Sequence, residues 1–170
     1  LKEDPNLKIY HQDGRIFLNN NTEIFDIIYG DAFASYFSIP FQLTTREAIG
    51  KIYNSLADDG VLVLNVISSL EGKKSKFFQA QYKTLKEYFA NIFIFPVKYY
   101  DEKDVNKHQN IIIFATKNKE ITKKVLLEKA DKEQQKLLEH LWEKEIIFDP
   151  EIKILTDNFA PVDFYISKLL

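Results

Sequence analysis

Residues 24–67 read IFDIIYGDAFASYFSIPFQLTTREAIGKIYNSLADDGVLVLNVI, and this stretch decides the fold class. It opens on a short, mostly apolar run that ends at Gly30-Asp31, and it closes on a second apolar run at 61–67. Between the two runs, Thr44 and Glu47 have the spacing of a capping box with Thr44 as the N-cap. Apolar residues then recur at helical intervals until Asp58-Asp59-Gly60 ends the helix. The stretch therefore predicts a strand, a helix and a second strand.

The rest of the chain continues this alternation. Further strands are predicted at 92–97 and 110–116, and Pro96 favours an edge strand or a bulge because it has no backbone N–H. A helix is predicted after Ser75, and residues 120–145 predict one or two amphipathic helices with a solvated, charge-balanced face. Unbroken apolar strands that alternate with amphipathic helices are typical of a parallel sheet covered on both faces. The predicted fold class is α/β.

Composition excludes several classes of protein. The chain has 170 residues, of which 45% are hydrophobic, and its net charge of −2 argues against a nucleic-acid binder. Its 14 Phe and 9 Tyr supply enough apolar surface to exclude disorder, and zero Cys excludes disulfides and thiolate chemistry. No apolar run is long enough to span a membrane. Because the chain begins at Leu1 and contains no Met, we expect a piece of a longer protein, with residues 1–170 forming a single domain.

Two acidic residues stand where an open α/β sheet places its ligands, beyond the carboxyl ends of the strands. Asp13 follows the apolar run at 7–12, which we interpret as the first strand, and Asp31 follows the second strand. A carboxylate there can accept hydrogen bonds from an adenine amino group or from ribose, or can take a proton from an amine. The alternative is that both are turn or cap residues, since Asp is favoured in such positions. The pattern alone leaves both interpretations open.

Other chemistries have less support. His11, His108 and His140 lie far apart, with no second ligand at metal-binding spacing, so no metal site is predicted. Ser68-Ser69 has no nearby His, and no nucleophile elbow occurs. There is also no glycine-rich phosphate-binding loop.

Several segments together resemble the spermidine synthase family. They are DPNLKIYHQDGRIFL (4–18), IFDIIYGDAF (24–33), IPFQLTTREA (39–48), DGVLVLNV (59–66) and the tail LTDNFAPVDFY (155–165). They occur in the family's order, and they are most similar to the spermidine synthase-like domains that bacteria often fuse to a membrane transporter region. In the tail, Asn158 stands where a second Asp is common. The resemblance identifies the chain as the carboxy-terminal part of such a domain.

The resemblance implies a class I methyltransferase-like Rossmann fold, truncated, with a mostly parallel sheet and an antiparallel last strand. It implies transfer of an aminopropyl group from decarboxylated S-adenosylmethionine to a diamine, without a metal. Asp13 would then bind the adenine, Gly14 would let the ring approach, and Asp31 would be the catalytic acid that orients and deprotonates the amine. The expected location is the cytoplasm, with the parent protein attached to a membrane on that side if a transporter region precedes it.

The chain departs from the family's pattern in three places. No second acid follows Asp31, although Tyr36 could cap a cation. Asn65 stands where polyamine-making members tend to have Gln or Glu, and Glu71 is a nearby substitute. The family's first two central strands and Gly-rich loop are absent, which leaves the strand at 24–29 with an open apolar edge. We therefore expect a homodimer, or edge-pairing with a separate amino-terminal half, and no activity from these 170 residues alone.

Two other functions remain open at this point. The first is methyl transfer from S-adenosylmethionine on the same fold. The second is a non-catalytic nucleoside-binding or structural domain, because fold alone does not determine function.

Overall fold

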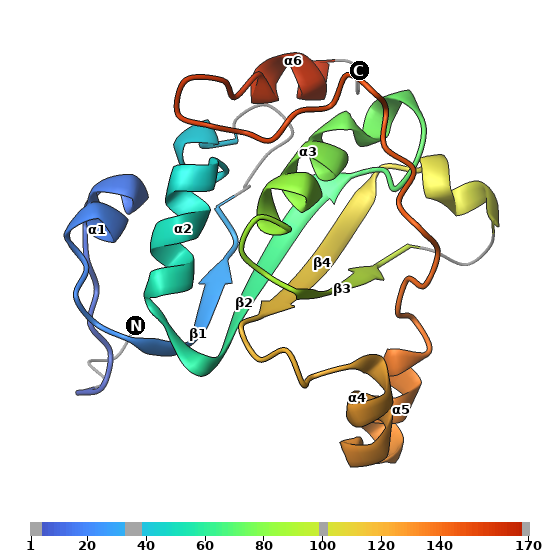
Figure 1. Ribbon diagram of the computed structural model, residues 1–170, viewed down its shortest axis with the longest axis horizontal. Coiled ribbons are helices and arrows are strands. Elements are labelled where there is room, and N and C mark those ends of the chain that lie inside the picture. The colour runs from blue at the N-terminus through green and yellow to red at the C-terminus, as the bar shows by residue number, and fades with distance from the viewer. Residues whose placement is uncertain (1–4, 33–38, 99–101, 168–170) are drawn as a thin grey trace.

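The computed structural model describes residues 5–32, 39–98 and 102–167. The helices are α1 (Gly14–Asn20), α2 (Arg46–Asn54), α3 (Lys76–Leu85), α4 (Lys123–Lys129), α5 (Lys132–Leu138) and α6 (Val162–Ser167). The strands are β1 (Phe25–Gly30), β2 (Leu56–Ser68), β3 (Asn91–Pro96) and β4 (Gln109–Thr116). Short 3-10 helices lie at η1 (Phe41–Leu43), η2 (Lys73–Ser75) and η3 (Glu102–Asn106). The predicted alternation of strands and helices is confirmed (Figure 1).

The four strands form one open sheet in the order β1-β2-β4-β3. β1 and β2 are parallel, whereas β4 is antiparallel to both of its neighbours, β2 and β3. Three strands therefore share one direction and the last strand runs against them, as the sequence resemblance implied. β3 lies at an edge of the sheet, which confirms the prediction made from Pro96.

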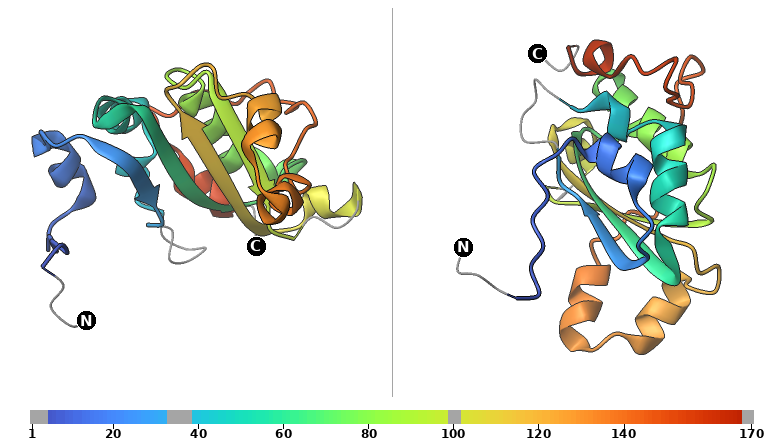
Figure 2. Two further views of the ribbon diagram at one scale, coloured as in Figure 1. Left: turned by 90° about the horizontal axis from the view of Figure 1, so that it is seen from below. Right: turned by 90° about the vertical axis from the view of Figure 1, so that its left-hand side faces the viewer.

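One face of the sheet carries the hydrophobic core. Every second residue of β2 and β4 is buried, and α2, α3 and α6 bury their apolar residues against these strands. The core includes Leu62, Leu64, Val66, Ile111, Ile113, Phe77, Phe78, Ile49 and Val162. Full burial of each large side chain contributes roughly 1.5–3 kcal/mol to folding. This single layer of helices fixes the orientation of the sheet and of its strand ends (Figures 1 and 2).

The opposite face of the sheet is open, so the prediction that helices cover both faces is wrong for the described residues. On this face Ile27 is 65% exposed, Tyr29 is 60% exposed and Phe114 is 36% exposed. The strands are apolar on both sides, but the helices that pack into the core lie on one side only. The right-hand view of Figure 2 shows α2 on one side of β1 and β2, with no helix opposite it.

Residues 7–12 do not form the first strand that the apolar run predicted. They lie outside any helix or strand, and Leu7, Ile9 and Tyr10 are each about half exposed, at 49%, 57% and 54%. A strand needs a neighbour to receive its backbone hydrogen bonds, and in the described structure the sheet ends at β1.

Two helix boundaries differ from the prediction by a few residues. The N-cap of α2 is Thr45 rather than Thr44, and its Oγ1 accepts the backbone N–H of Ala48 at 3.3 Å. The helix ends at Asn54, before the Asp58-Asp59-Gly60 turn. That turn lies instead within an irregular first part of β2, where the pairing with β1 shifts.

The charged region after β4 forms two short helices, α4 and α5, which project beyond one end of the sheet (Figure 1). Neither helix has a buried residue, which agrees with the predicted solvated face. Of the described helices, none has the length and apolar character that crossing a membrane requires.

Candidate functional site

Asp31 lies at the carboxyl end of β1, immediately after Gly30, and its side chain is exposed. The parallel register pairs Gly30 with Leu64, so the next residue of β2, Asn65, lies beside Asp31. Asn65 Nδ2 donates a hydrogen bond to Asp31 Oδ1 at 2.9 Å. This is the part of an open α/β sheet where ligands bind, and the prediction placed Asp31 there.

The amide of Asn65 is held from its other side by a residue of the next strand. Asn110 of β4 donates through Nδ2 to Asn65 Oδ1, also at 2.9 Å. The three side chains thus form a hydrogen-bonded row across β1, β2 and β4 on the open face. Sequence reasoning noted Asn65 only as a departure from the family and did not select Asn110. The available signal was that Asn65 interrupts an otherwise apolar run, whereas Asn110 lies at the polar start of β4 and gave no such signal.

Asp13 serves as the N-cap of α1. Its Oδ1 accepts the backbone N–H groups of Ile16 at 3.1 Å and Arg15 at 2.8 Å, and these bonds hold the pKa of the Asp13 carboxyl below its usual value. Its Oδ2 accepts only a long hydrogen bond from Gln42 Nε2, at 3.4 Å. The cap interpretation therefore describes one oxygen of Asp13, while the other oxygen belongs to an exposed side chain and is only weakly engaged by Gln42.

Gly14 packs closely against η1. A Cβ added at Gly14 would lie 3.3 Å from Leu43 Cδ1, so the missing side chain allows α1 to approach this segment. The predicted contact of Gly14 with an adenine ring remains a prediction.

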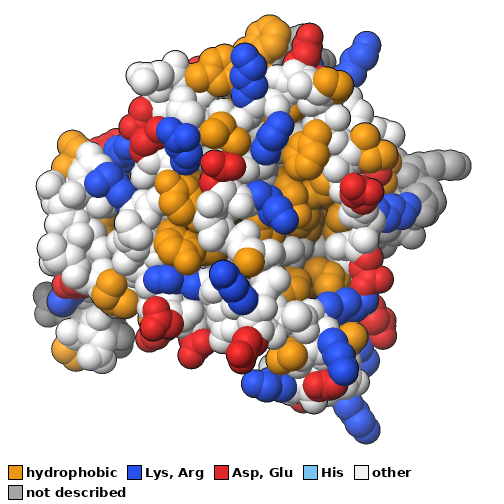
Figure 3. All heavy atoms as spheres, in the orientation of Figure 1, with side chains coloured by type: hydrophobic (Ala, Val, Ile, Leu, Met, Phe, Trp, Pro, Cys, Tyr) orange, Lys and Arg blue, Asp and Glu red, His pale blue; other side chains and the backbone are white. Residues whose placement is uncertain are grey.

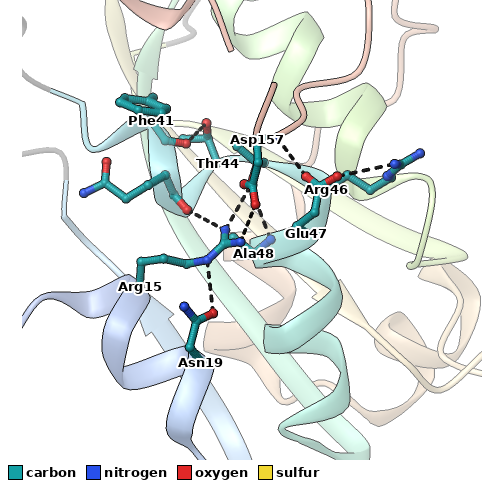
Figure 4. Close-up of polar contacts among 10 residues, drawn as sticks. Arg15, Asn19, Phe41, Thr44, Arg46, Glu47, Ala48 and Asp157 are labelled. Atoms are coloured by element: carbon teal, nitrogen blue, oxygen red, sulfur yellow. Dashed lines mark hydrogen bonds and ion pairs between the residues drawn. The ribbon is translucent and has the colours of Figure 1, made fainter. Parts of the chain in front are cut away.

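A polar cluster around Arg15 fixes the helix that carries Asp13 (Figure 4). Arg15 Nη1 donates to the backbone carbonyl of Gln42 at 2.9 Å and to Thr45 Oγ1 at 3.1 Å, while Nη2 lies 2.6 Å from Asp157 Oδ2. Thr45 Oγ1 donates to Asp157 Oδ1 at 2.7 Å. Asp157 belongs to the tail motif noted in the sequence, and the structure gives it a role as the anchor of α1.

Of the two predicted amine-binding residues, the structure describes only Glu71. Glu71 follows the carboxyl end of β2, so it lies at the same edge of the sheet as Asp31. It is half-buried, and its backbone N–H donates to Val105 O at 3.0 Å. Tyr36 lies outside the described residues.

Two cavities in the described part of the chain lie away from these residues. A groove of about 560 Å³ runs between α3, β3 and the segment at 142–148, where apolar side chains gather in the face shown in Figure 3. A smaller cavity of about 240 Å³ lies between Lys76 and α6. Neither is lined by a predicted site residue, and within the ranges described above no group of His, Asp or Glu side chains is arranged to hold a metal ion.

Comparisons with known proteins give the class of this domain. No family model matches the chain. Over 87 residues the chain is 31% identical to the polyamine aminopropyltransferase of Alkaliphilus oremlandii, a match that covers 51% of this chain and 30% of that protein. Over 61 residues it is 38% identical to the polyamine aminopropyltransferase of Streptococcus pneumoniae, covering 36% of this chain and 21% of that protein.

Solved structures show the same fold. A probable spermidine synthase from Corynebacterium glutamicum has a TM-score of 0.59 at 18% identity, covering 87% of this chain and 57% of the other. Human methyltransferase-like protein 13, in complex with SAH, has a TM-score of 0.56 at 16% identity, with coverages of 89% and 66%. The spermidine synthase of Thermotoga maritima has a TM-score of 0.51.

The fold is thus a Rossmann-like fold of the kind found in methyltransferases and spermidine synthases. Within that class, the curated relatives support assigning the chain to a spermidine synthase-like family. The matched part is less than a third of the length of those relatives.

Proposed function

We propose that this chain is the carboxy-terminal part of an aminopropyltransferase domain, which transfers an aminopropyl group from decarboxylated S-adenosylmethionine to a small amine. The observation that carries the proposal is Asp31, a carboxylate held at the end of a parallel strand in a chain similar to polyamine aminopropyltransferases. The proposed domain covers residues 1–170.

The proposed reaction needs one base and no metal. The neutral amine nitrogen attacks the propyl carbon bonded to the sulfonium, and a C–N bond forms as the C–S bond breaks. The sulfur keeps the electron pair and becomes the neutral thioether of methylthioadenosine. The new ammonium then gives its extra proton to the Asp31 carboxylate, which can accept it through Oδ2 because Oδ1 already accepts from Asn65.

We assign nucleoside binding to the residues at the start of helix α1. Asp13 Oδ2 would accept from the adenine amino group, and Gly14 would lie against the ring. Glu71 and Tyr36 would contact the amine substrate, and we place the domain in the cytoplasm. If the parent protein carries a transporter region, the domain lies at the cytoplasmic side of that membrane.

A partner is proposed for the free side of β1. In the described structure β1 pairs only with β2, and its exposed Ile27 and Tyr29 continue the apolar open face. Such an edge pairs readily with another strand. A second copy of the chain, or a separate amino-terminal half, would complete the sheet there.

One observation favours a second candidate function. The fold similarity to human methyltransferase-like protein 13 is close to that of the spermidine synthase, and that protein was solved with SAH. Methyl transfer from S-adenosylmethionine is therefore the alternative, and the two functions differ in which form of the nucleoside binds.

The test is thermal unfolding of the chain with methylthioadenosine, S-adenosylmethionine and decarboxylated S-adenosylmethionine. A ligand at 100 times its Kd stabilises the folded state by about 2.7 kcal/mol, which raises the Tm measurably. We expect a rise with the decarboxylated form and methylthioadenosine but not with S-adenosylmethionine. The matched control is Asp13→Asn, which keeps an N-cap but changes the acceptor and should remove the rise. A rise with S-adenosylmethionine alone would favour methyl transfer, and no rise with any ligand would contradict nucleoside binding by this chain.

A further inference from the structure

The open face of the sheet is mostly apolar, and a row of polar side chains crosses it near Asp31, whereas Asn91 and Thr116 lie at its other end. Its apolar members include Ile27, Tyr29 and Phe114, which come from β1 and β4. Asn65 and Asn110 stand on the same face and form the row that ends at Asp31. Two amides on an apolar face cost stability unless they are hydrogen-bonded, so their pairing with each other and with Asp31 is an organised feature of the site.

The direction of this row is fixed by chemistry. An ionised carboxylate can only accept hydrogen bonds, so Asn65 must turn its Nδ2 toward Asp31. Its Oδ1 then faces β4, where only a donor can satisfy it, and Asn110 Nδ2 supplies that donor at 2.9 Å. Both amide dipoles therefore point their donor ends toward Asp31, and such chains strengthen one another.

The row also restricts the side-chain conformation of Asp31. Asp31 is exposed at the end of a strand, where a short side chain would otherwise exchange among its staggered rotamers. The bond at Oδ1 selects one of them and leaves Oδ2 without a hydrogen bond among the described residues. Asn110 likewise restricts the side-chain conformation of Asn65, because an Asn whose amide oxygen and nitrogen are both hydrogen-bonded cannot rotate without breaking one of these bonds.

We propose that Asn65 and Asn110 are positioning residues that hold the Asp31 carboxylate in one rotamer, with Oδ1 fixed and Oδ2 presented to the amine. The catalytic meaning of this role rests on the proposed function, whereas the geometry does not. Asn65 acts on Asp31 directly, and Asn110 acts through Asn65.

The test measures the side-chain rotamer of Asp31 by NMR, from the three-bond couplings of its Cγ to the backbone nitrogen and carbonyl carbon. We expect the couplings of a single rotamer in the unaltered chain and rotamer-averaged couplings in Asn65→Leu. Asn110→Leu should give intermediate averaging, although the hydrogen bond of Asn110 is to Asn65 and not to Asp31. The matched control is Ile112→Val on the same face, which pairs with Asn65 in the strand register and should leave the couplings unchanged.

Each outcome bears on the proposal. Averaged couplings in the unaltered chain would overturn it without any variant, so it does not depend on whether the variants fold. An effect of Asn65→Leu with none from Asn110→Leu would remove Asn110 from the role. Equal effects of Ile112→Val and Asn110→Leu would show a packing effect instead of an action of Asn110 through Asn65.

A second measurement separates this proposal from the proposed function. Where aminopropyl transfer is measured, Asn65→Leu should lower kcat by ~10-fold or more and leave nucleoside affinity unchanged, because a misplaced base slows the chemical step. In the parent protein, or in the chain combined with a separate amino-terminal half, fixed Asp31 couplings without any transfer activity would keep the positioning role and reject the aminopropyltransferase function. Unchanged kcat in Asn65→Leu, in a chain that is active, would reject the positioning role and keep the function.

Discussion

Arg15 and Asp157 lie 142 positions apart in the sequence, and their side chains meet with Nη2 and Oδ2 separated by 2.6 Å. The Arg15 side chain is only 16% exposed, whereas that of Asp157 is 45% exposed. Asp157 also accepts from Thr45, so the contact joins the first helix, the start of α2 and the tail. Since α1 has no fully buried residue and only Leu18 of it packs partly buried against the core, this contact is one of the main ones that hold the helix in place.

Replacement of Arg15 tests that conclusion. We expect Arg15→Ala to lower the free energy of unfolding by about 1–2 kcal/mol, because charge-assisted hydrogen bonds are lost at a partly solvated site. Urea unfolding measures this change, and amide hydrogen exchange should increase in α1 first. The control is Arg46→Ala, whose ion pair with Glu47 is exposed and contributes about 0–1 kcal/mol. Equal losses in the two variants, or unchanged exchange in α1, would contradict the role of Arg15.

The stability of the fold should depend on pH through His108. Burial lowers the pKa of His108, and the nearby positive charge of Lys74 lowers it further. The unfolded chain, with a His pKa of about 6.5, then takes up the proton first as the pH falls. The stability that neutral His108 provides is therefore complete above about pH 6.5 and is lost as the pH falls through the folded-state pKa.

Two variants measure this dependence. The difference in unfolding free energy between the unaltered chain and His108→Gln should shrink from pH 7.5 toward pH 5. In an NMR titration, Lys74→Met should move the midpoint of His108 upward because it removes the charge. A His108 midpoint above 6.5 in the unaltered chain would show that the imidazolium is stabilised instead.

The proposed base is tested by Asp31→Asn. This variant keeps the size of the side chain but cannot accept the proton, so we expect the turnover of the intact parent protein to fall by about 10²-fold or more. Nucleoside binding, measured by the Tm shift, should be unchanged. Turnover that survives the substitution would remove Asp31 from the proposed chemistry.

The free side of β1 predicts association. Sedimentation velocity should show a dimer of the unaltered chain, or a complex with a separate amino-terminal half. Ile27→Lys should give a monomer because a charged side chain on an edge strand disfavours pairing with another strand. Leu137→Lys is the control, because Leu137 is equally exposed, at 65%, but lies on α5, away from this edge. A folded monomer without the substitution would argue against pairing through β1.

The fold could be predicted from the sequence wherever apolar patterns were strong. The run at 61–67 and the helical spacing after Arg46 define their elements alone, and Pro96 identifies an edge strand. The run at 7–12 misled the prediction because an apolar run shows only a tendency to be buried, whereas a strand also requires a hydrogen-bonding neighbour. The prediction that helices cover both faces of the sheet was wrong for a similar reason, since this coverage depends on how many helices the chain supplies to each side.

The site was predictable in part. Asp31 could be located because it directly follows a recognisable strand. Its contact with Asn65 depends on the register between β1 and β2, which the irregular start of β2 shifts in a way that the sequence does not specify. The pairing of Arg15 with Asp157 joins residues from opposite ends of the chain, and no local pattern predicts such a contact.

The helix pair α4 and α5 has a practical consequence. Because neither helix buries a residue in the core, the connection between them at Ala130-Asp131 can be lengthened without opening the sheet. A fluorescent or affinity module inserted there would lie beyond the end of the sheet, away from Asp31 and from the free side of β1. A module at this position would therefore report ligand binding and association while Asp31 and the free side of β1 stay unaltered.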